Sequence, residues 1–249
     1  MKGTRLLRSM GHVDEGFLAD AMETPAPAQR RKGRVTIAAA ACLLLLAGAA
    51  LWHSRQPYVI DLDRVTVNPL TAAYPAQPAY DSAGLRQVSW ESLEITEYYG
   101  RDLTPAYIPE DLEPLQSECT AQVLVDADGT VVRDAVEVVY AADHEQEDTQ
   151  DGQSLRGFSM TVSTQDALIW EYASPGDQRQ TVDIDGVQVT LGEIAVTDTR
   201  GEYEPFTVYT ASFTLEEVRY SLRFQHLDMK DVVKVVASII RGDDRIEVK

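Results

Sequence analysis

Side chains with the spacing of a catalytic site are scarce in this chain. Its 249 residues include four histidines, His12, His53, His144 and His226, but no His-Glu-x-x-His zinc motif and no Gly-x-Ser-x-Gly nucleophile turn. His144 lies among carboxylates, where a solvated acidic loop is the more frequent arrangement. The acidic residues are too numerous to single out a general acid and base, because such a pair is recognised by its separation in space. The sequence therefore nominates no catalytic residue, and we do not expect an enzyme.

Metal ligands are equally hard to find. The stretch Asp126-Ala127-Asp128-Gly129 begins like a calcium loop, but the later ligands and the closing Glu of such a loop are missing. An Asp-Gly pair between two alternating apolar stretches is instead typical of a β-hairpin turn. Neither Cys42 nor Cys119 has a His or Cys at zinc-ligand spacing. We expect no bound metal and no cofactor.

Aromatic side chains are the remaining candidates for ligand binding. One group lies in a predicted short helix and the loop after it: Trp90, Tyr98, Tyr99 and Tyr107. A second group lies in predicted strands: Trp170, Tyr172, Phe206, Tyr209 and Phe213. At these spacings a place in the hydrophobic core is more frequent than a place around a ligand.

An apolar segment, Val35–Trp52, divides the chain. It has no charged residue and would reach about 27 Å as a helix, close to the ~30 Å hydrocarbon core of a bilayer. Four cations precede the segment and favour a cytoplasmic N-terminus: Arg30, Arg31, Lys32 and Arg34. At its other end lies Trp52, an aromatic residue of the kind found at membrane interfaces. We expect a single membrane-spanning helix bound to the lipid bilayer. Cleavage after Ala49, as in a signal peptide, and a buried soluble helix are the alternatives.

The charge differs on the two sides of this segment. Residues 1–34 have seven Lys and Arg against four Asp and Glu, a net charge of +3, whereas residues 53–249 have fifteen against thirty-six, a net charge of −21. Such an acidic region repels nucleic acid and anionic lipid headgroups, so neither is an expected partner. Its ligand cannot be named from the composition.

The N-terminal tail has an amphipathic pattern. Apolar residues recur at steps of three and four, as expected for a helix that binds a cytoplasmic partner: Leu6, Met10, Val13 and Phe17. A helix this short is marginal alone and needs a protein or membrane surface to stabilise it.

Beyond the apolar segment we expect an extended linker, residues 53–88, with one strand at Tyr58–Val67 and a proline-rich loop at Asn68–Gly84. A helix at Ser89–Tyr99, with Ser92 as an alternative start and Gly100 as its end, opens the domain of residues 89–249. The domain continues in a meandering antiparallel sheet of about eight strands: Glu118–Val125, Thr130–Tyr140, Leu155–Ser163, Ala167–Tyr172, Gln180–Ile184, Val187–Thr197, Phe206–Phe213 and Val218–His226.

The last predicted element is an amphipathic helix. Asp228 is its expected N-cap and Gly242 its stop, and its apolar face comprises Met229, Val232, Val233, Val236, Ile239 and Ile240. The fold class is therefore α+β, a curved antiparallel sheet packed with a few helices.

Several motifs resemble one family. The stretch SWESLEITEYYGRDLTPAYIPEDLEPL, the ending YTASFTLEEVRYSLRFQHLDMKDVVKVVASII and the tail MGHVDEGFLADAM are similar to single-pass, anti-sigma-like bacterial membrane proteins with a C-terminal extracytoplasmic domain of unknown function. The matching residues of the first stretch are Ser92, Leu93, Glu94, Tyr98, Tyr99, Gly100, Pro105, Tyr107, Ile108, Pro109 and Glu110. This resemblance implies a half-barrel distantly related to LolA and RseB.

The chain departs from that family in its short tail, since 34 residues cannot hold the helical domain with which anti-sigma factors bind a sigma factor, and the His-x3-Cys-x2-Cys motif is absent. We expect a membrane-anchored envelope sensor or anti-sigma-like regulator, whose tail binds a cytoplasmic protein such as a sigma factor and whose outer domain binds an unknown ligand. A carrier for a lipid or other apolar ligand is the alternative, and a tethered hydrolase is a third.

Overall fold

The computed structural model describes residues 57–75, 83–90, 92–115, 120–142, 156–165, 170–173, 179–197 and 205–249. All of them belong to one unit, residues 57–249. Within these residues no helix is long and apolar enough to cross a membrane. The predicted span Val35–Trp52 and the predicted tail lie outside the described residues.

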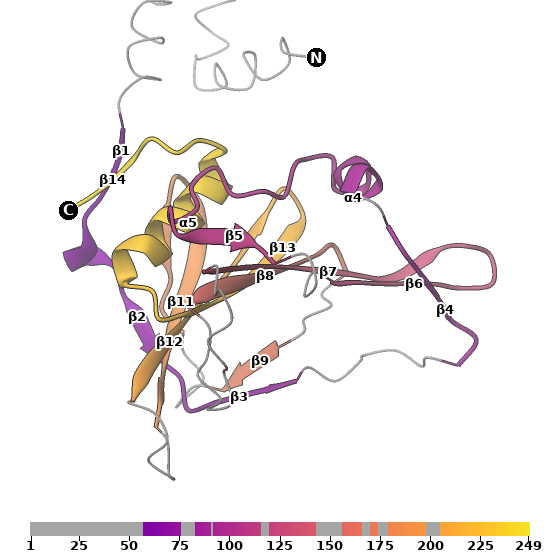
Figure 1. Cartoon of the computed structure of the whole chain (residues 1–249), viewed down its shortest axis with the longest axis horizontal. Helices are drawn as coiled ribbons and strands as arrows, with labels where there is room; N and C mark the ends of the chain where they lie inside the picture. Colours follow the sequence, from indigo (N-terminus) through magenta and orange to yellow (C-terminus); the bar gives the residue numbers. More distant parts are fainter. Residues whose placement is uncertain are drawn as a thin grey trace, which may run out of the picture. The chain divides into compact units, whose positions relative to one another are not determined.

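The central element is an open sheet (Figure 1). Its strands follow the order β10-β11-β12-β13-β8-β7-β6-β4, and every neighbouring pair in this order is antiparallel. The bounds are Arg86–Val88 (β4), Thr120–Val125 (β6), Val131–Ala142 (β7), Gly157–Ser163 (β8), Val182–Ile184 (β10), Val187–Val196 (β11), Phe206–Leu215 (β12) and Val218–Gln225 (β13). The prediction of a mostly antiparallel β domain with few helices is confirmed.

Local turn residues explain the hairpins. The Asp126–Gly129 stretch is a turn, in which Asp126 Oδ1 accepts hydrogen bonds from the backbone nitrogens of Asp128 at 2.9 Å and Thr130 at 2.8 Å. Asp185 and Gly186, both with positive φ, join β10 to β11. These two Asp-Gly turns set the register of the strands that they connect.

Short strands from the predicted linker complete the fold. They are β1 (Tyr58–Ile60), β2 (Val67–Pro69) and β3 (Ala72–Pro75), with a 3-10 turn at Leu62–Arg64. β2 runs parallel to β11, β3 pairs with β9 (Trp170–Ala173), and β1 runs parallel to the C-terminal strand β14 (Ile246–Val248). A further short strand, β5 (Leu112–Pro114), pairs with the end of β7.

Three expectations about these segments were wrong. Tyr58–Val67 is two strands separated by a turn, not one strand, and part of the expected loop Asn68–Gly84 forms β3. The segment Ala167–Tyr172 was expected in the main sheet, but its described end pairs with β3. Strands of only three or four residues show too little alternation of apolar and polar side chains to be recognised in a sequence.

The C-terminal helix α5, Met229–Arg241, begins and ends where the sequence predicts. The carboxylate of Asp228 accepts a hydrogen bond from the backbone nitrogen of Asp231 at 2.8 Å, and Gly242 adopts the left-handed conformation of a C-cap. The earlier helix α4, Ser92–Tyr99, starts at the second of the two predicted positions, and Gly100 follows it with a φ of 67°.

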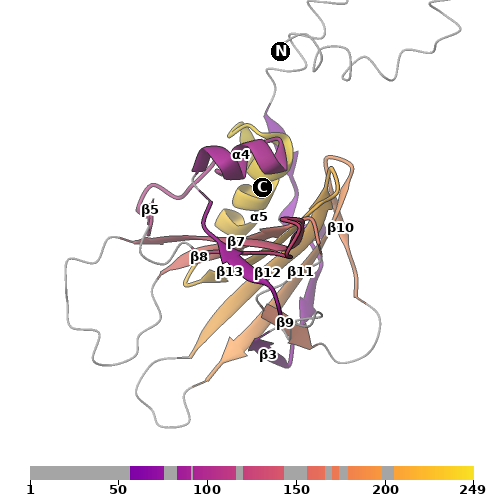
Figure 2. The same cartoon turned by 90° about the vertical axis from the view of Figure 1, so that its right-hand side faces the viewer.

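The main sheet separates two layers (Figures 1 and 2). Helices α4 and α5 lie on one side, and the β3–β9 pair lies on the other. Side chains of β13 alternate strictly, so that Tyr220, Leu222 and Phe224 are buried against the core with α5 while the residues between them point to the second face. The hydrophobic core thus lies between the sheet and α5.

Candidate functional site

The face of the main sheet opposite α5 carries a line of hydroxyl groups. Successive register partners on four adjacent strands carry hydroxyl groups, and we call them the hydroxyl row: Thr161 on β8, Ser221 on β13, Ser212 on β12 and Thr190 on β11. The carboxylate residue Glu137 on β7 occupies the next position beside Thr161.

A small hollow with about 20 Å³ of enclosed space, room for about one water molecule, lies over part of this row. Its lining residues come from the sheet, from the β3–β9 pair and from neighbouring loops: Leu70, Tyr172, Arg179, Thr190, Gly192, Thr210, Ala211, Ser212 and Ser221. Gly192 helps to shape the hollow, because a Cβ there would lie 2.6 Å from a methyl carbon of Leu70 and 2.7 Å from Thr210 Oγ1. Any larger residue at this position would displace one of those two side chains.

Thr210 lines the hollow from β12. The residue is 6% exposed, and its Oγ1 would lie 2.7 Å from a Cβ at position 192.

Tyr172, from β9, forms part of the opposite wall. Burial raises the pKa of Tyr172 to about 12; the nearby Arg223 opposes this shift and Glu137 adds to it. The phenol is therefore neutral at physiological pH and can both donate and accept a hydrogen bond. At the rim, a guanidinium nitrogen of Arg179 donates to the backbone oxygen of Tyr172 at 2.5 Å.

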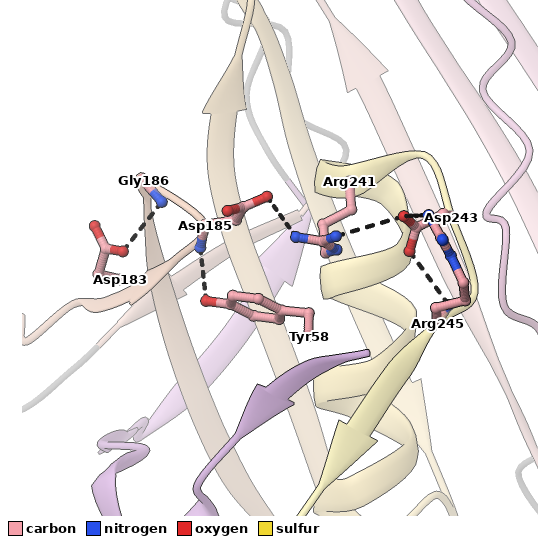
Figure 3. A network of polar contacts seen from close by, with 7 residues as sticks. All are labelled: Tyr58, Asp183, Asp185, Gly186, Arg241, Asp243 and Arg245. Carbon is pink, nitrogen blue, oxygen red and sulfur yellow. Dashed lines mark hydrogen bonds and ion pairs between the residues drawn. The ribbon is translucent and has the colours of Figure 1, made fainter. Parts of the chain in front are cut away.

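A second polar site joins the two ends of the described unit (Figure 3). β1 and β14 pair over three residues each, and we call this pair with its side-chain contacts the terminal clasp. Three backbone hydrogen bonds lie at this pair. The nitrogen of Tyr58 donates to the oxygen of Arg245 at 2.8 Å. The nitrogen of Leu62 donates to the oxygen of Lys249, and the nitrogen of Lys249 donates to the oxygen of Ile60, both at 2.9 Å. The clasp ties the residues that follow the apolar segment in the sequence to the C-terminus.

Side chains strengthen the terminal clasp (Figure 3). Arg241, at the end of α5, lies over the ring of Tyr58 at 4.8 Å and forms an ion pair with Asp185 at 2.8 Å. The hydroxyl oxygen of Tyr58 accepts a hydrogen bond from the backbone nitrogen of Asp185 at 2.8 Å. The β10–β11 turn, α5 and β1 therefore meet at one point.

Asp243 lies between α5 and β14 and forms ion pairs with Arg241 and Arg245. Burial raises the pKa of its carboxyl, but the hydrogen bond from Arg245 at 2.9 Å and the charge of Arg241 outweigh burial, so that the pKa lies below its ordinary value. A lowered folded-state pKa contributes stability above the unfolded pKa, near 4, and this stability is lost as the pH falls.

We therefore expect Asp243→Asn to lower the free energy of unfolding by about 1 kcal/mol or less at pH 7, because its partners are partly exposed. The difference from the unchanged protein should shrink as the pH falls below about 4. Urea unfolding at a series of pH values measures it. A difference that stays constant down to the lowest pH would contradict the assigned role of the Asp243 charge.

A buried carboxylate stabilises the other end of the domain. Asp134 on β7 is fully buried; its carboxylate accepts hydrogen bonds from Ser163 Oγ at 2.5 Å and from the backbone nitrogen and Oγ1 of Thr164 at 2.7 and 2.6 Å. The Tyr99 hydroxyl donates to the backbone oxygen of Asp134, and burial together with the Asp134 charge raises the pKa of this phenol. The carboxylate therefore joins β7 to the end of β8, while the backbone oxygen of Asp134 joins β7 to α4.

Tyr107, one of the residues that carry the family resemblance, has a structural partner. Its hydroxyl donates to Asp231 Oδ1 at 2.8 Å, while Lys234 lies 4.9 Å from its ring centre. Burial and the hydrogen bond to Asp231 raise the pKa of Tyr107 to about 12. This contact fixes the loop after α4 to the first turns of α5.

The predicted site residues are placed as follows. The tail residues Leu6, Met10, Val13 and Phe17 and the anchor residues Arg30, Arg31, Lys32, Arg34 and Trp52 lie outside the described residues. Among the described aromatic residues, Tyr99 and Phe213 are buried as expected, whereas Tyr98 is exposed and Tyr172 lines the hollow. His226 is exposed at the end of β13, where its ring stacks on Phe206 at 4.3 Å.

In the parts of the chain that the structure describes, no group of three His, Cys, Asp or Glu side chains could hold a metal ion. Comparisons with protein-family models, with curated proteins and with solved structures find no match for this chain. The candidate sites therefore have to be interpreted from their own geometry.

Proposed function

We propose that the chain is a single-pass membrane-anchored sensor or regulator without enzymatic activity. In this proposal residues 35–52 span the cell membrane, residues 1–34 lie in the cytoplasm, and residues 53–249 lie outside and bind a ligand. The tail binds a cytoplasmic protein such as a sigma factor through Leu6, Met10, Val13 and Phe17. The apolar segment and its preceding cations support the membrane topology.

The observation that carries the proposal is the terminal clasp. A domain that is only tethered needs no ordered connection to its anchor, and a flexible linker would serve. Here the chain is already paired with β14 at Tyr58, six residues after the apolar segment ends, and it contacts α5 and the β10–β11 turn. Rearrangement of the domain would therefore act directly on the residues that lead to the membrane.

The hollow on the second face favours this proposal over a carrier of apolar ligands. A carrier needs an apolar cavity of several hundred Å³. The enclosed space of the hollow is only about 20 Å³, room for about one water molecule. The described face toward α5 is filled by the protein's own core.

We also propose, from the motifs, a distant relation to the anti-sigma-like membrane proteins and to the LolA and RseB half-barrels. An antiparallel sheet with helices α4 and α5 over one face supports this relation. Tyr99, Tyr107 and Gly100, which belong to the matching residues, have structural roles at the ends of α4 and in the loop after it.

Photo-crosslinking from the tail tests the proposal. A photoreactive amino acid at Met10 or Phe17 should capture a cytoplasmic protein in intact cells, and Val13→Asp should abolish the capture because it places a charge on the apolar face. The intact mass of the membrane-bound chain should include residues 1–34. A mature N-terminus at Ala50, or no captured protein at either position, would contradict the proposal.

A further inference from the structure

We propose that residues 57–66 form a strap that opens and closes on β14 while the main sheet stays folded. In the closed state the strap forms the β1 half of the terminal clasp. In the open state its ten residues lengthen the connection between the domain and the segment that precedes it. The role of this opening rests on the proposed function, because added reach matters to an anchored domain, whereas the opening itself rests on the contacts of the clasp.

The strap is held by few backbone contacts. Among the described residues, β1 and β14 form a two-stranded sheet separate from the main one and pair over three residues, whereas β12 and β13 pair over eight. A two-stranded sheet is marginal alone, and parallel pairing is slightly less stable per residue than antiparallel pairing. Elements of this kind open with the lowest free energies in a folded protein.

The strap also buries little apolar surface. Of its ten residues Ile60 alone is buried, at 7% exposed, and Val59 is 47% exposed. Tyr58, Leu62 and Val65 are half-buried against the core. On β13, by contrast, every second residue is buried. Opening of the strap therefore exposes one buried side chain and leaves the core of the main sheet in place.

Asn68 sets the point at which the opening ends. Its Nδ2 donates hydrogen bonds to the backbone oxygens of Gln180 at 2.8 Å and Leu191 at 2.7 Å, and its Oδ1 accepts one from the backbone nitrogen of Gln180 at 2.8 Å. The residue is 7% exposed, so its release would break three hydrogen bonds in a buried place, which costs free energy. β2 therefore stays on β11 when β1 leaves β14.

Side chains close the strap without locking it (Figure 3). Tyr58 contacts the guanidinium of Arg241 and the backbone of Asp185, and the ion pair between Arg241 and Asp185 is partly exposed, with side chains 18% and 48% accessible. Partly exposed ion pairs contribute little stability. β14 is held to α5 independently of the strap, since Asp243 forms ion pairs with Arg241 at 3.4 Å and Arg245 at 2.9 Å.

Opening changes the reach of the connection. In the closed state five residues, 53–57, separate the end of the apolar segment from Tyr58. The ten residues of the strap add up to about 33 Å when fully extended, at about 3.3 Å per residue. In the proposed sensor the open strap therefore lets the domain move away from the membrane while both ends of the chain stay connected.

Native-state hydrogen exchange of the full chain in detergent micelles, at urea concentrations below the unfolding transition, tests the strap. The amides of Tyr58, Leu62 and Lys249 donate across the clasp and should exchange at least about 100-fold faster than the slowest amides of β13. Their rates should barely depend on urea, because the opening exposes little surface, whereas the β13 rates should rise steeply with urea.

A disulfide across the clasp provides a locked chain and its matched control. Val59 and Glu247 are register partners at exposed positions, and neighbouring strands lie about 4.8 Å apart, within the span of a disulfide. The variant carries Val59→Cys and Glu247→Cys, with the natural cysteines replaced by Ser. Oxidation should slow the exchange of Leu62 and Lys249 at least about ten-fold, and reduction of the same chain should restore the faster exchange.

Four results would overturn the inference. Clasp amides as protected as those of β13, with the same urea dependence, would exclude an independent opening, and clasp amides without any protection would exclude the closed state. A disulfide that does not form would contradict the register of the closed clasp. A disulfide that forms and leaves the exchange of Leu62 and Lys249 unchanged would exclude departure of β1 from β14. A mature N-terminus at Ala50 would contradict the proposed function and would leave these exchange results unchanged.

Discussion

Replacement of Asp134 by Ala is expected to lower the free energy of unfolding by about 3 to 5 kcal/mol. The change removes the acceptor of three hydrogen bonds, which come from the buried Ser163 hydroxyl and from the backbone nitrogen and hydroxyl of Thr164. It also creates space beside Tyr99, whose hydroxyl contacts the Asp134 backbone. Urea unfolding followed by far-UV circular dichroism measures the loss.

Asp128→Ala is the control, because Asp128 lies in the exposed β6–β7 turn and contributes its backbone nitrogen rather than its side chain. This variant should stay within about 0.5 kcal/mol of the unchanged protein. A loss below about 1 kcal/mol for Asp134→Ala would show that the buried carboxylate does not hold β7 and the end of β8 together.

Removal of residues 243–249 is expected to open the terminal clasp. The truncation deletes β14, removes the buried side chain of Ile246 and takes away the backbone partners of Tyr58 and Leu62. Loss of one buried aliphatic side chain and several hydrogen bonds should cost about 3 kcal/mol or more. Hydrogen exchange measures the local effect, and the amides of Tyr58 and Leu62 should exchange fast in the truncated chain.

Glu247→Ala is the matched control for the truncation. Glu247 is exposed. Among the described residues its carboxylate forms an ion pair with Lys249 alone, at 3.5 Å. The variant keeps β14, so Tyr58 and Leu62 should remain protected from exchange. Equal protection of these two amides in the truncated chain and in the Glu247→Ala chain would contradict the clasp.

Elements whose signals are local could be predicted from the sequence. α5 was predicted with its bounds because Asp228, Gly242 and an apolar repeat of 3.6 residues all lie within fifteen residues. The β6–β7 hairpin was predicted because its turn contains Asp128 and Gly129 between alternating strands. In both cases short-range geometry and the burial pattern favour the same structure.

The candidate sites depend on contacts between distant residues and could not be predicted in this way. β1 and β14 are about 190 residues apart and pair over three residues each. The members of the hydroxyl row are single polar positions in four strands, and such alternation normally indicates a solvated face. Only the register of β11, β12, β13 and β8 brings them into one line.

One strand connects the two candidate sites. β11 follows the Asp185–Gly186 turn, which contacts Tyr58 and Arg241 in the terminal clasp, and it carries Thr190 and Gly192 in the hollow.

The central claim, that the outer domain and the tail act together, is tested most directly by transcript profiling. Cells with the full chain are compared with cells whose chain lacks Met1–Thr24 and with cells whose chain carries Tyr58→Ala and Arg241→Ala, at equal amounts in the membrane. The account predicts that the tail deletion changes a defined set of transcripts and that the clasp variant changes the same set. Transcripts unchanged by the tail deletion would contradict it.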